Sequence, residues 1–189
     1  MPPSFLRFAV ALSASTLLLP AQTTITFTDG LVRATAIDTS APNSPTTLAL
    51  ATGAATQSGV IGGTGSGTVS GAGTLTLLGT SFGGYGIDSL VVSDGTLKLT
   101  PAFNDQYIRN DVGSLTMSGG TLDMKSIAGR NTTQNIIGTL NIAEGASRIR
   151  VTGATGAATF LNLQDINNPS GINYEKGGNI LFEVNEIGR

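Results

Sequence analysis

Short segments with alternating hydrophobic and polar residues recur along this chain at nearly constant spacing. Three of them begin with Gly-Thr-Leu: GTLTL at 73–77, GTLKL at 95–99 and GTLDM at 120–124; a related phrase, GASRI, follows at 145–149. The gaps between their leading glycines are 22, 25 and 25 residues. A period of this size, in segments with strand-like alternation, is typical of stacked repeat architectures. The pattern therefore predicts a solenoid of short strands.

Each of the last three phrases follows a matching half, SLVV at 89–92, SLTM at 114–117 and TLNI at 139–142. If the residues between the halves form corners around Gly95, Gly119-Gly120 and Gly145, alternation turns the apolar side chains of both halves inward. The predicted inward residues are Leu90, Val92, Leu97 and Leu99, then Leu115, Met117, Leu122 and Met124, then Leu140, Ile142, Ile149 and Val151, with Ser147 in place of an expected leucine.

Stacked coils would place Leu90, Leu115 and Leu140 in one column and the corner glycines in another, with layers about 4.8 Å apart. We therefore expect an all-β parallel β-helix of about six or seven coils. An antiparallel sandwich or meander of hairpins is the alternative, because Asp94-Gly95 between alternating strands is also a strong hairpin signal. The equal spacing favours the helix.

The chain divides into three predicted regions. Residues 1–21 resemble a secretory signal peptide, with Arg7 before an apolar run and Pro20-Ala21 before the expected cleavage site. A buried hydrophobic helix is the alternative interpretation of this apolar run. The run is too short to cross a membrane as a stable anchor. Residues 22–58 are predicted to be a capping strand with loops, and residues 59–189 to be the repeats.

The composition excludes several kinds of chemistry. The chain contains no Cys and no His, so it lacks thiolate nucleophiles, disulfides, Cys/His zinc sites and imidazole bases. Ten basic and twelve acidic residues give a net charge of −2, which provides no basic surface for nucleic acid. We expect no cofactor and no nucleic-acid partner.

Residues 59–79 read GVIGGTGSGTVSGAGTLTLLG, the most Gly-dense part of the chain. This stretch resembles the autotransporter-associated β-strand repeat of large secreted bacterial proteins. The family's lysine before Gly-x-Gly is absent here, where Val69 and Ser70 stand, and residues 114–151 fit the repeat more loosely. The matching residues are Gly59, Val60, Ile61, Gly63, Gly65, Gly71, Gly73, Thr74, Leu75, Leu77, Gly79, Gly83, Gly84, Tyr85, Gly95, Thr96 and Leu97. The resemblance implies a right-handed parallel β-helix at the cell surface, usually carried by an outer-membrane barrel, and it does not imply an enzyme.

Two segments carry candidate ligand chemistry. Residues 83–91, GGYGIDSLV, contain one copy of a calcium β-roll nonapeptide, but a lone copy with Asp88 does not supply the six to eight oxygens that calcium takes, so we interpret it as a coil corner. The loop 101–112 is the most polar cluster, with Asn104, Asp105, Tyr107, Arg109, Asn110 and Asp111. Its side chains suit a sugar, a cation or acid-base chemistry, although a solvated side loop is the simpler interpretation.

The segment 129–134 is predicted to be a second side loop. It includes Arg130, which a polysaccharide-cleaving enzyme would need to bring close to Asp105, Arg109 and Asp111, and a formal glycosylation acceptor at Asn131-Thr132-Thr133. We assign no catalytic, cofactor-binding or metal-binding residue.

The sequence thus predicts an exported structural or surface-interaction protein without catalytic activity, secreted or located at the bacterial cell surface. Its expected partners are an extracellular glycan or protein, and a C-terminal outer-membrane barrel if the chain is part of a longer autotransporter. No transmembrane span is expected. A polysaccharide-active or carbohydrate-binding β-helix protein is the alternative.

Overall fold

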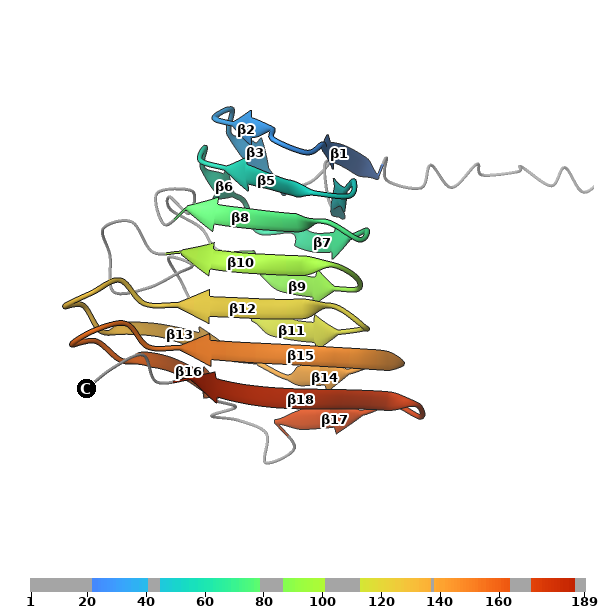
Figure 1. Ribbon diagram of the computed structural model, residues 1–189. Helices are drawn as coiled ribbons and strands as arrows, with labels where there is room; N and C mark the ends of the chain where they lie inside the picture. Colours follow the sequence, from blue (N-terminus) through green and yellow to red (C-terminus); the bar gives the residue numbers. More distant parts are fainter. Residues whose placement is uncertain are drawn as a thin grey trace, which may run out of the picture.

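The computed structural model describes residues 22–40, 45–78, 87–100, 113–136, 138–163 and 171–185, and within these ranges it contains strands and no helix. Figure 1 shows the strands stacked in layers, from β1 and β2 at the blue end to β17 and β18 at the red end. Two seven-stranded sheets form most of the stack. The architecture is the predicted β-solenoid, consistent with a right-handed parallel β-helix.

Sheet A has the strand order β1-β4-β7-β9-β11-β14-β17, and sheet B the order β18-β15-β12-β10-β8-β5-β2. The strands of sheet A are β1 (Thr23–Phe27), β4 (Thr46–Leu50), β7 (Ser66–Ser70), β9 (Ser89–Val92), β11 (Ser114–Met117), β14 (Leu140–Ile142) and β17 (Ile172–Tyr174). Those of sheet B are β2 (Val32–Arg33), β5 (Ala54–Gln57), β8 (Thr74–Leu78), β10 (Thr96–Thr100), β12 (Thr121–Lys125), β15 (Gly145–Thr152) and β18 (Gly178–Asn185). Two smaller pairs lie outside these sheets: β3 (Ile37–Asp38) with β6 (Ile61–Gly62), and β13 (Thr132–Ile136) with β16 (Thr159–Leu163).

The register confirms the predicted leucine column. Leu115 pairs with Leu90 on one side and with Leu140 on the other. In sheet B, Leu122 pairs with Leu97 and with Ile149. The hairpin alternative is wrong, because β9 and β10 belong to different sheets and the ladders between named strands are parallel.

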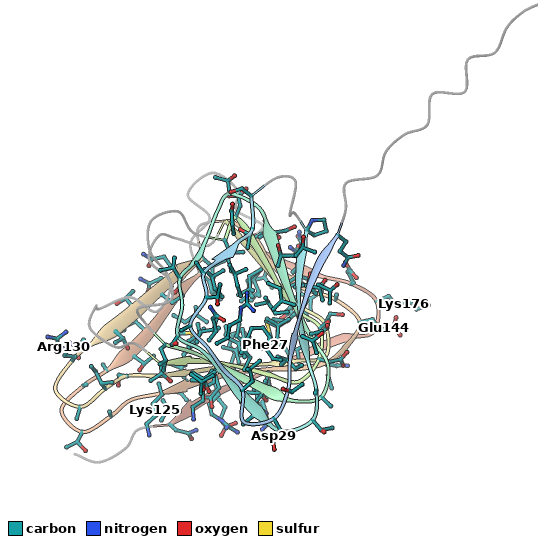
Figure 2. All side chains as sticks on the ribbon, turned by 90° about the horizontal axis from the view of Figure 1, so that it is seen from above. Phe27, Asp29, Lys125, Arg130, Glu144 and Lys176 are labelled. Carbon is teal, nitrogen blue, oxygen red and sulfur yellow. The ribbon has the colours of Figure 1, made fainter. Side chains whose placement is uncertain are left out.

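All twelve residues predicted to point inward are buried, each with 9% or less of its surface exposed. They form one core with the apolar residues of the earlier layers. Figure 2 looks down the stack and shows Phe27 near the middle of the cross-section, whereas Lys125, Arg130 and Glu144 lie at its rim. The alternation of each strand therefore separates a continuous apolar interior from a polar outside.

The third repeat differs from the prediction at its corner. Thr121 pairs with Arg148, so the leucine position is filled by Ile149 and not by Ser147. The corner after β14 is thus two residues longer than the β9–β10 and β11–β12 corners. As a result, Gly145 lies beside Gly119 and not beside Gly120, the residue in register with Gly95. Ser147 is buried within this corner, where its Oγ accepts a hydrogen bond from the backbone N–H of Gly119 at 2.9 Å.

Residues 22–58, predicted to be a cap, already belong to the stack. β1 pairs in parallel with β4, and β2 with β5, so the layers extend to Thr23. Phe27, in this first layer, is 1% exposed. The predicted side loop 129–134 is wrong in its second half, because residues from Thr132 onward form β13, which stacks on β16.

Candidate functional site

A ladder of charged side chains runs along the outer face of sheet B. The register places Thr76, Lys98, Asp123, Arg150 and Glu183 in one row across five neighbouring strands. The last four alternate in sign. They occupy the outward position between two inward apolar residues of each strand, which is why the repeat pattern presents them on one face.

Ion pairs connect the last three charges of this ladder. The Arg150 guanidinium lies 3.9 Å from the Asp123 carboxylate (Nη1 to Oδ2) and 3.3 Å from that of Glu183 (Nε to Oε2). Arg148 also approaches Glu183, at 3.8 Å. The side-chain amide of Asn185 donates a hydrogen bond to Glu183 at 3.0 Å, and this bond, followed by the effect of Arg150, holds the pKa of Glu183 below its ordinary value.

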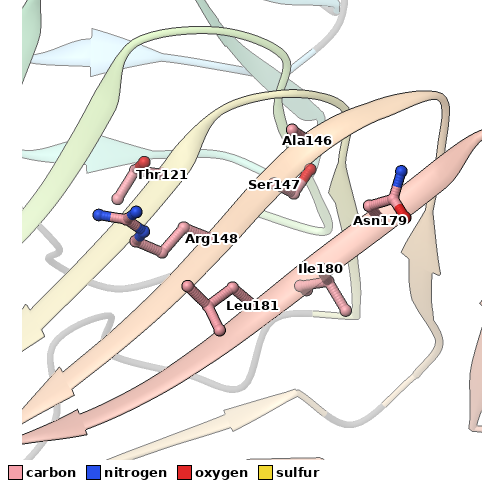
Figure 3. Close-up of a pocket in the computed structure, with 7 residues that line it drawn as sticks. All are labelled: Thr121, Ala146, Ser147, Arg148, Asn179, Ile180 and Leu181. Carbon is pink, nitrogen blue, oxygen red and sulfur yellow. The ribbon is translucent and has the colours of Figure 1, made fainter.

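A shallow depression of about 340 Å³ lies beside the ladder, at the lengthened corner (Figure 3). Figure 3 shows the Arg148 side chain next to Thr121, with Asn179 on the neighbouring strand toward the corner. Its lining residues are Thr121, Ala146, Ser147, Arg148, Asn179, Ile180 and Leu181. A guanidinium, a hydroxyl and an amide are hydrogen-bonding groups, but the lining contains no carboxylate or other base for proton transfer. The depression therefore offers the Arg148 and Asn179 side chains as hydrogen-bonding groups beside an apolar surface of Ala146, Ile180 and Leu181.

The outer face of sheet A has a different chemistry. Its central row consists of small neutral side chains and one amide pair: Thr24, Thr47, Thr68, Val91, Thr116, Asn141 and Asn173. Neighbours in the row bond along the stack, as from Asn141 to Thr116 (3.4 Å) and from Asn173 to Asn141 (3.2 Å). Some of the hydrogen-bonding groups on this face therefore bond to the neighbouring layer.

The residues singled out in the sequence do not form a site in the described structure. Asp88 is exposed, and residues 83–86 of the same motif lie outside the described residues. Among the residues that the structure describes, no group of three or more acidic side chains is placed to hold a metal ion. The loop 101–112, with Asp105, Arg109 and Asp111, also lies outside the described residues.

Arg130 is exposed at the turn between β12 and β13. The neighbouring Asn131 accepts a hydrogen bond from the backbone N–H of Ala158 at 2.8 Å, and Thr132 is buried in β13. The formal glycosylation acceptor is therefore built into the stack, with its asparagine bonded to the next layer.

Sequence reasoning missed the charge ladder. Its signal was present, because Lys98, Asp123, Arg150 and Glu183 all stand between two apolar residues in a strand-like segment. The two-residue insertion before Arg148 hid the alignment of the third repeat with the second.

Comparison with known protein families, with curated proteins and with solved structures finds no match for this chain. In the part of the chain that the structure describes, no helix is long and apolar enough to cross a membrane.

Proposed function

We propose that this chain is an exported, non-catalytic structural or surface-interaction protein, working as a rigid β-solenoid. The observation that carries the proposal is the parallel register that runs through both seven-stranded sheets. Each inner strand is hydrogen-bonded on both sides and its apolar residues join one core, so the stack forms a stiff rod with long outer faces. Such faces suit contact with extended partners at a cell surface.

The location of the protein outside the cytoplasm is part of the same proposal. The signal-like residues 1–21 support export, and the Gly-rich motif 59–79 supports a passenger of the autotransporter type with a barrel elsewhere. The low charge and the absence of cysteine are compatible with this location.

Export is tested by producing the full chain in a Gram-negative bacterium and separating the cytoplasm, periplasm and medium. We expect the chain outside the cytoplasm, with a mature N-terminus at Gln22. A Leu18→Arg variant, which interrupts the apolar run, is the matched control and should remain uncleaved inside. Retention of the unchanged chain in the cytoplasm, uncleaved, would contradict the proposal.

The rod-like role is tested by limited proteolysis of the purified protein. We expect the stack to survive protease concentrations that digest a heat-unfolded sample, since cleavage requires local opening. Rapid cutting at many sites between residues 23 and 185 would refute a rigid spacer.

A carbohydrate-binding role is the second candidate, favoured by the depression at Arg148. The guanidinium and the Asn179 amide are groups that hydrogen-bond to sugars, and exposed Leu181 offers an apolar surface beside them. A glycan array compares the unchanged protein with Arg148→Ala, and Lys125→Ala is the control for loss of charge elsewhere on sheet B. Equal signals from all three proteins, or no signal, would end this candidate.

A further inference from the structure

The charged residues of sheet B are concentrated on the outer face of its last four strands. The preceding strands β5 and β8 contain no charged residue. In β10, β12, β15 and β18 the outward positions carry four basic and two acidic residues: Lys98, Lys125, Arg148, Arg150, Asp123 and Glu183. This set, called the basic face, has a net charge of +2, whereas the whole chain has a net charge of −2.

The two acids of the basic face are paired within it. The Asp123 carboxylate lies 3.9 Å from the Arg150 guanidinium, and the Glu183 carboxylate lies 3.3 Å from the same group. The Asp123 side chain is 16% exposed, against 33% for Arg150 and 44% for Arg148. An aspartate side chain is short, whereas lysine and arginine carry their charges into the solvent on long aliphatic stems. The charge that this face presents to a partner is therefore mainly positive.

The two lysines of the basic face form no ion pair with another described residue. Lys98 lies beside Asp123 in the register, but the ion pair of this aspartate is made with Arg150. Lys125 is exposed, and its neighbour in β15 is the uncharged Thr152. An anion that binds to either lysine therefore displaces no internal partner.

Uncharged hydrogen-bonding groups lie beside these charges. Thr96 and Thr121 continue the row of Arg148, and Thr76 continues the row of Lys98. The outward positions of β8, β10, β12, β15 and β18 contain no aromatic residue, so this face has no platform on which nucleic-acid bases stack. Hydroxyl groups suit the hydroxyls of a sugar, and cations suit carboxylates.

We propose that the basic face binds an acidic polysaccharide, a polymer in which carboxylates recur along a chain of sugars. Its cations pair with the carboxylates, and its threonines bond to sugar hydroxyls. Figure 1 shows β10, β12, β15 and β18 side by side as one broad surface, which suits an extended polymer. The inference rests on the carbohydrate-binding candidate above and deepens it, because it makes the ligand acidic and extends the site from the depression at Arg148 to Lys98 and Lys125.

The first experiment compares two forms of one polymer by isothermal titration calorimetry with the purified chain. The probe is polygalacturonate, and the matched ligand is the same polymer with its carboxylates methyl-esterified, which keeps the sugar and removes the charge. We expect severalfold tighter binding of polygalacturonate at low salt, and weaker binding as salt is added, because exposed charges are screened. Equal or tighter binding of the esterified polymer would overturn this inference and leave the carbohydrate-binding candidate standing. Absence of binding to either polymer would also overturn it, while the glycan array decides the candidate separately.

The second experiment repeats the titration with variants of the basic face. Lys98→Ala and Lys125→Ala lie outside the depression, so each should weaken binding of polygalacturonate about two- to fivefold, the range for one exposed charge, and leave the esterified polymer unaffected. Asp123→Asn should tighten binding of polygalacturonate, because it removes a negative charge from the face. Lys176→Ala is the control, since Lys176 is exposed in the turn before β18 and lies far from Lys125 in the cross-section (Figure 2).

Circular dichroism checks that each variant is folded. Unchanged affinity in both folded lysine variants, or weaker binding by Asp123→Asn, would overturn the proposal. If Arg148→Ala alone weakened binding, the site would be the depression and not the basic face. Tighter binding to single-stranded DNA, or to vesicles of equal parts phosphatidylcholine and phosphatidylserine, would make another polyanion the partner and would refute the assignment to an acidic polysaccharide.

Discussion

Leu115→Ala tests whether the leucine columns hold the stack together. Leu115 is fully buried in β11, between Leu90 of the preceding layer and Leu140 of the next. Shortening this side chain leaves a void in the middle of the column. The fixed spacing of the layers, set by backbone hydrogen bonds on both sides of β11, limits how far the neighbours move to fill it.

The expected loss of stability follows from the burial. Three carbon atoms leave a site with no exposure, which removes about 2.4 kcal/mol of transfer free energy at about 0.8 kcal/mol for each buried CH₂. The remaining void raises the cost, and buried leucine-to-alanine changes span about 2 to 5 kcal/mol. We expect about 3 to 4 kcal/mol, which for a chain of this size lowers the melting temperature by about 6 to 16 °C.

Urea unfolding followed by circular dichroism measures this change. The matched control is Thr116→Ala, the next residue along β11, which points outward and accepts a 3.4 Å bond from Asn141. Its cost should stay within about 0.5 kcal/mol. If Leu115→Ala costs no more than Thr116→Ala, the inward column is not the core and the reasoning from alternation fails.

Further predictions concern glycines and charges. Gly67→Ala should raise the free energy of unfolding by about 0.5 to 1 kcal/mol, because Gly67 lies in a strand and its added Cβ would meet Ile87 at an ordinary 3.5 Å. Gly73→Ala should instead lower it by about 1 to 3 kcal/mol, since the Cβ would collide with the backbone carbonyl of Ala51; both are measured by urea unfolding. Arg150→Gln should cost about 0.2 to 1 kcal/mol at low salt and less at high salt, measured in the same way. The pKa of Glu183 is lowered in the folded state. Its contribution to the free energy of unfolding is therefore present at neutral pH and is lost as the pH falls through the folded-state pKa. Thermal melts of Glu183→Gln should accordingly show a smaller loss of stability on acidification than melts of the unchanged chain.

The sequence was sufficient to predict the register of those layers in which each repeat has the same number of residues. Between β9 and β11, and between β10 and β12, the interval is 25 residues on both faces, so aligning the phrases also aligned the structure. In the next layer the interval stays 25 in sheet A but becomes 27 in sheet B. An insertion of two residues leaves the alternation of inward and outward positions unchanged. Ile149 and Val151 were therefore correctly placed inward, while Ser147 was assigned to the wrong row.

The third side of the stack, formed in these layers by β13 and β16, was harder to predict because its inward residues in β13 are polar. Thr132 and Gln134 of β13 are buried, and no apolar alternation marks the first part of this strand. Their burial is compatible with stability because hydrogen-bonding groups lie close by. Gln134 donates to the carbonyl of Asn135 at 2.9 Å, and Thr159 of the next layer donates to the carbonyl of Thr152 at 2.8 Å. The Thr132 and Thr159 hydroxyls also form a 3.5 Å bond between the two layers, and because these residues are 27 apart in the sequence, a local pattern does not reveal it.

The charge ladder on sheet B bears on how near-identical layers find their proper neighbours. Lys98, Asp123, Arg150 and Glu183 alternate in sign, so each charge meets an opposite charge in the adjacent layer. If a coil were skipped during folding, Lys98 would face Arg150, or Asp123 would face Glu183, and attraction would become repulsion. Each cross-strand pair is worth about 0.2 to 1 kcal/mol, so a native pair lost and a like-charge pair gained together penalise the skipped arrangement. The apolar columns alone would discriminate poorly, since one apolar residue stacks on another in either arrangement. In this part of the stack the interior therefore supplies stability, while the outer face of sheet B specifies the order of the layers.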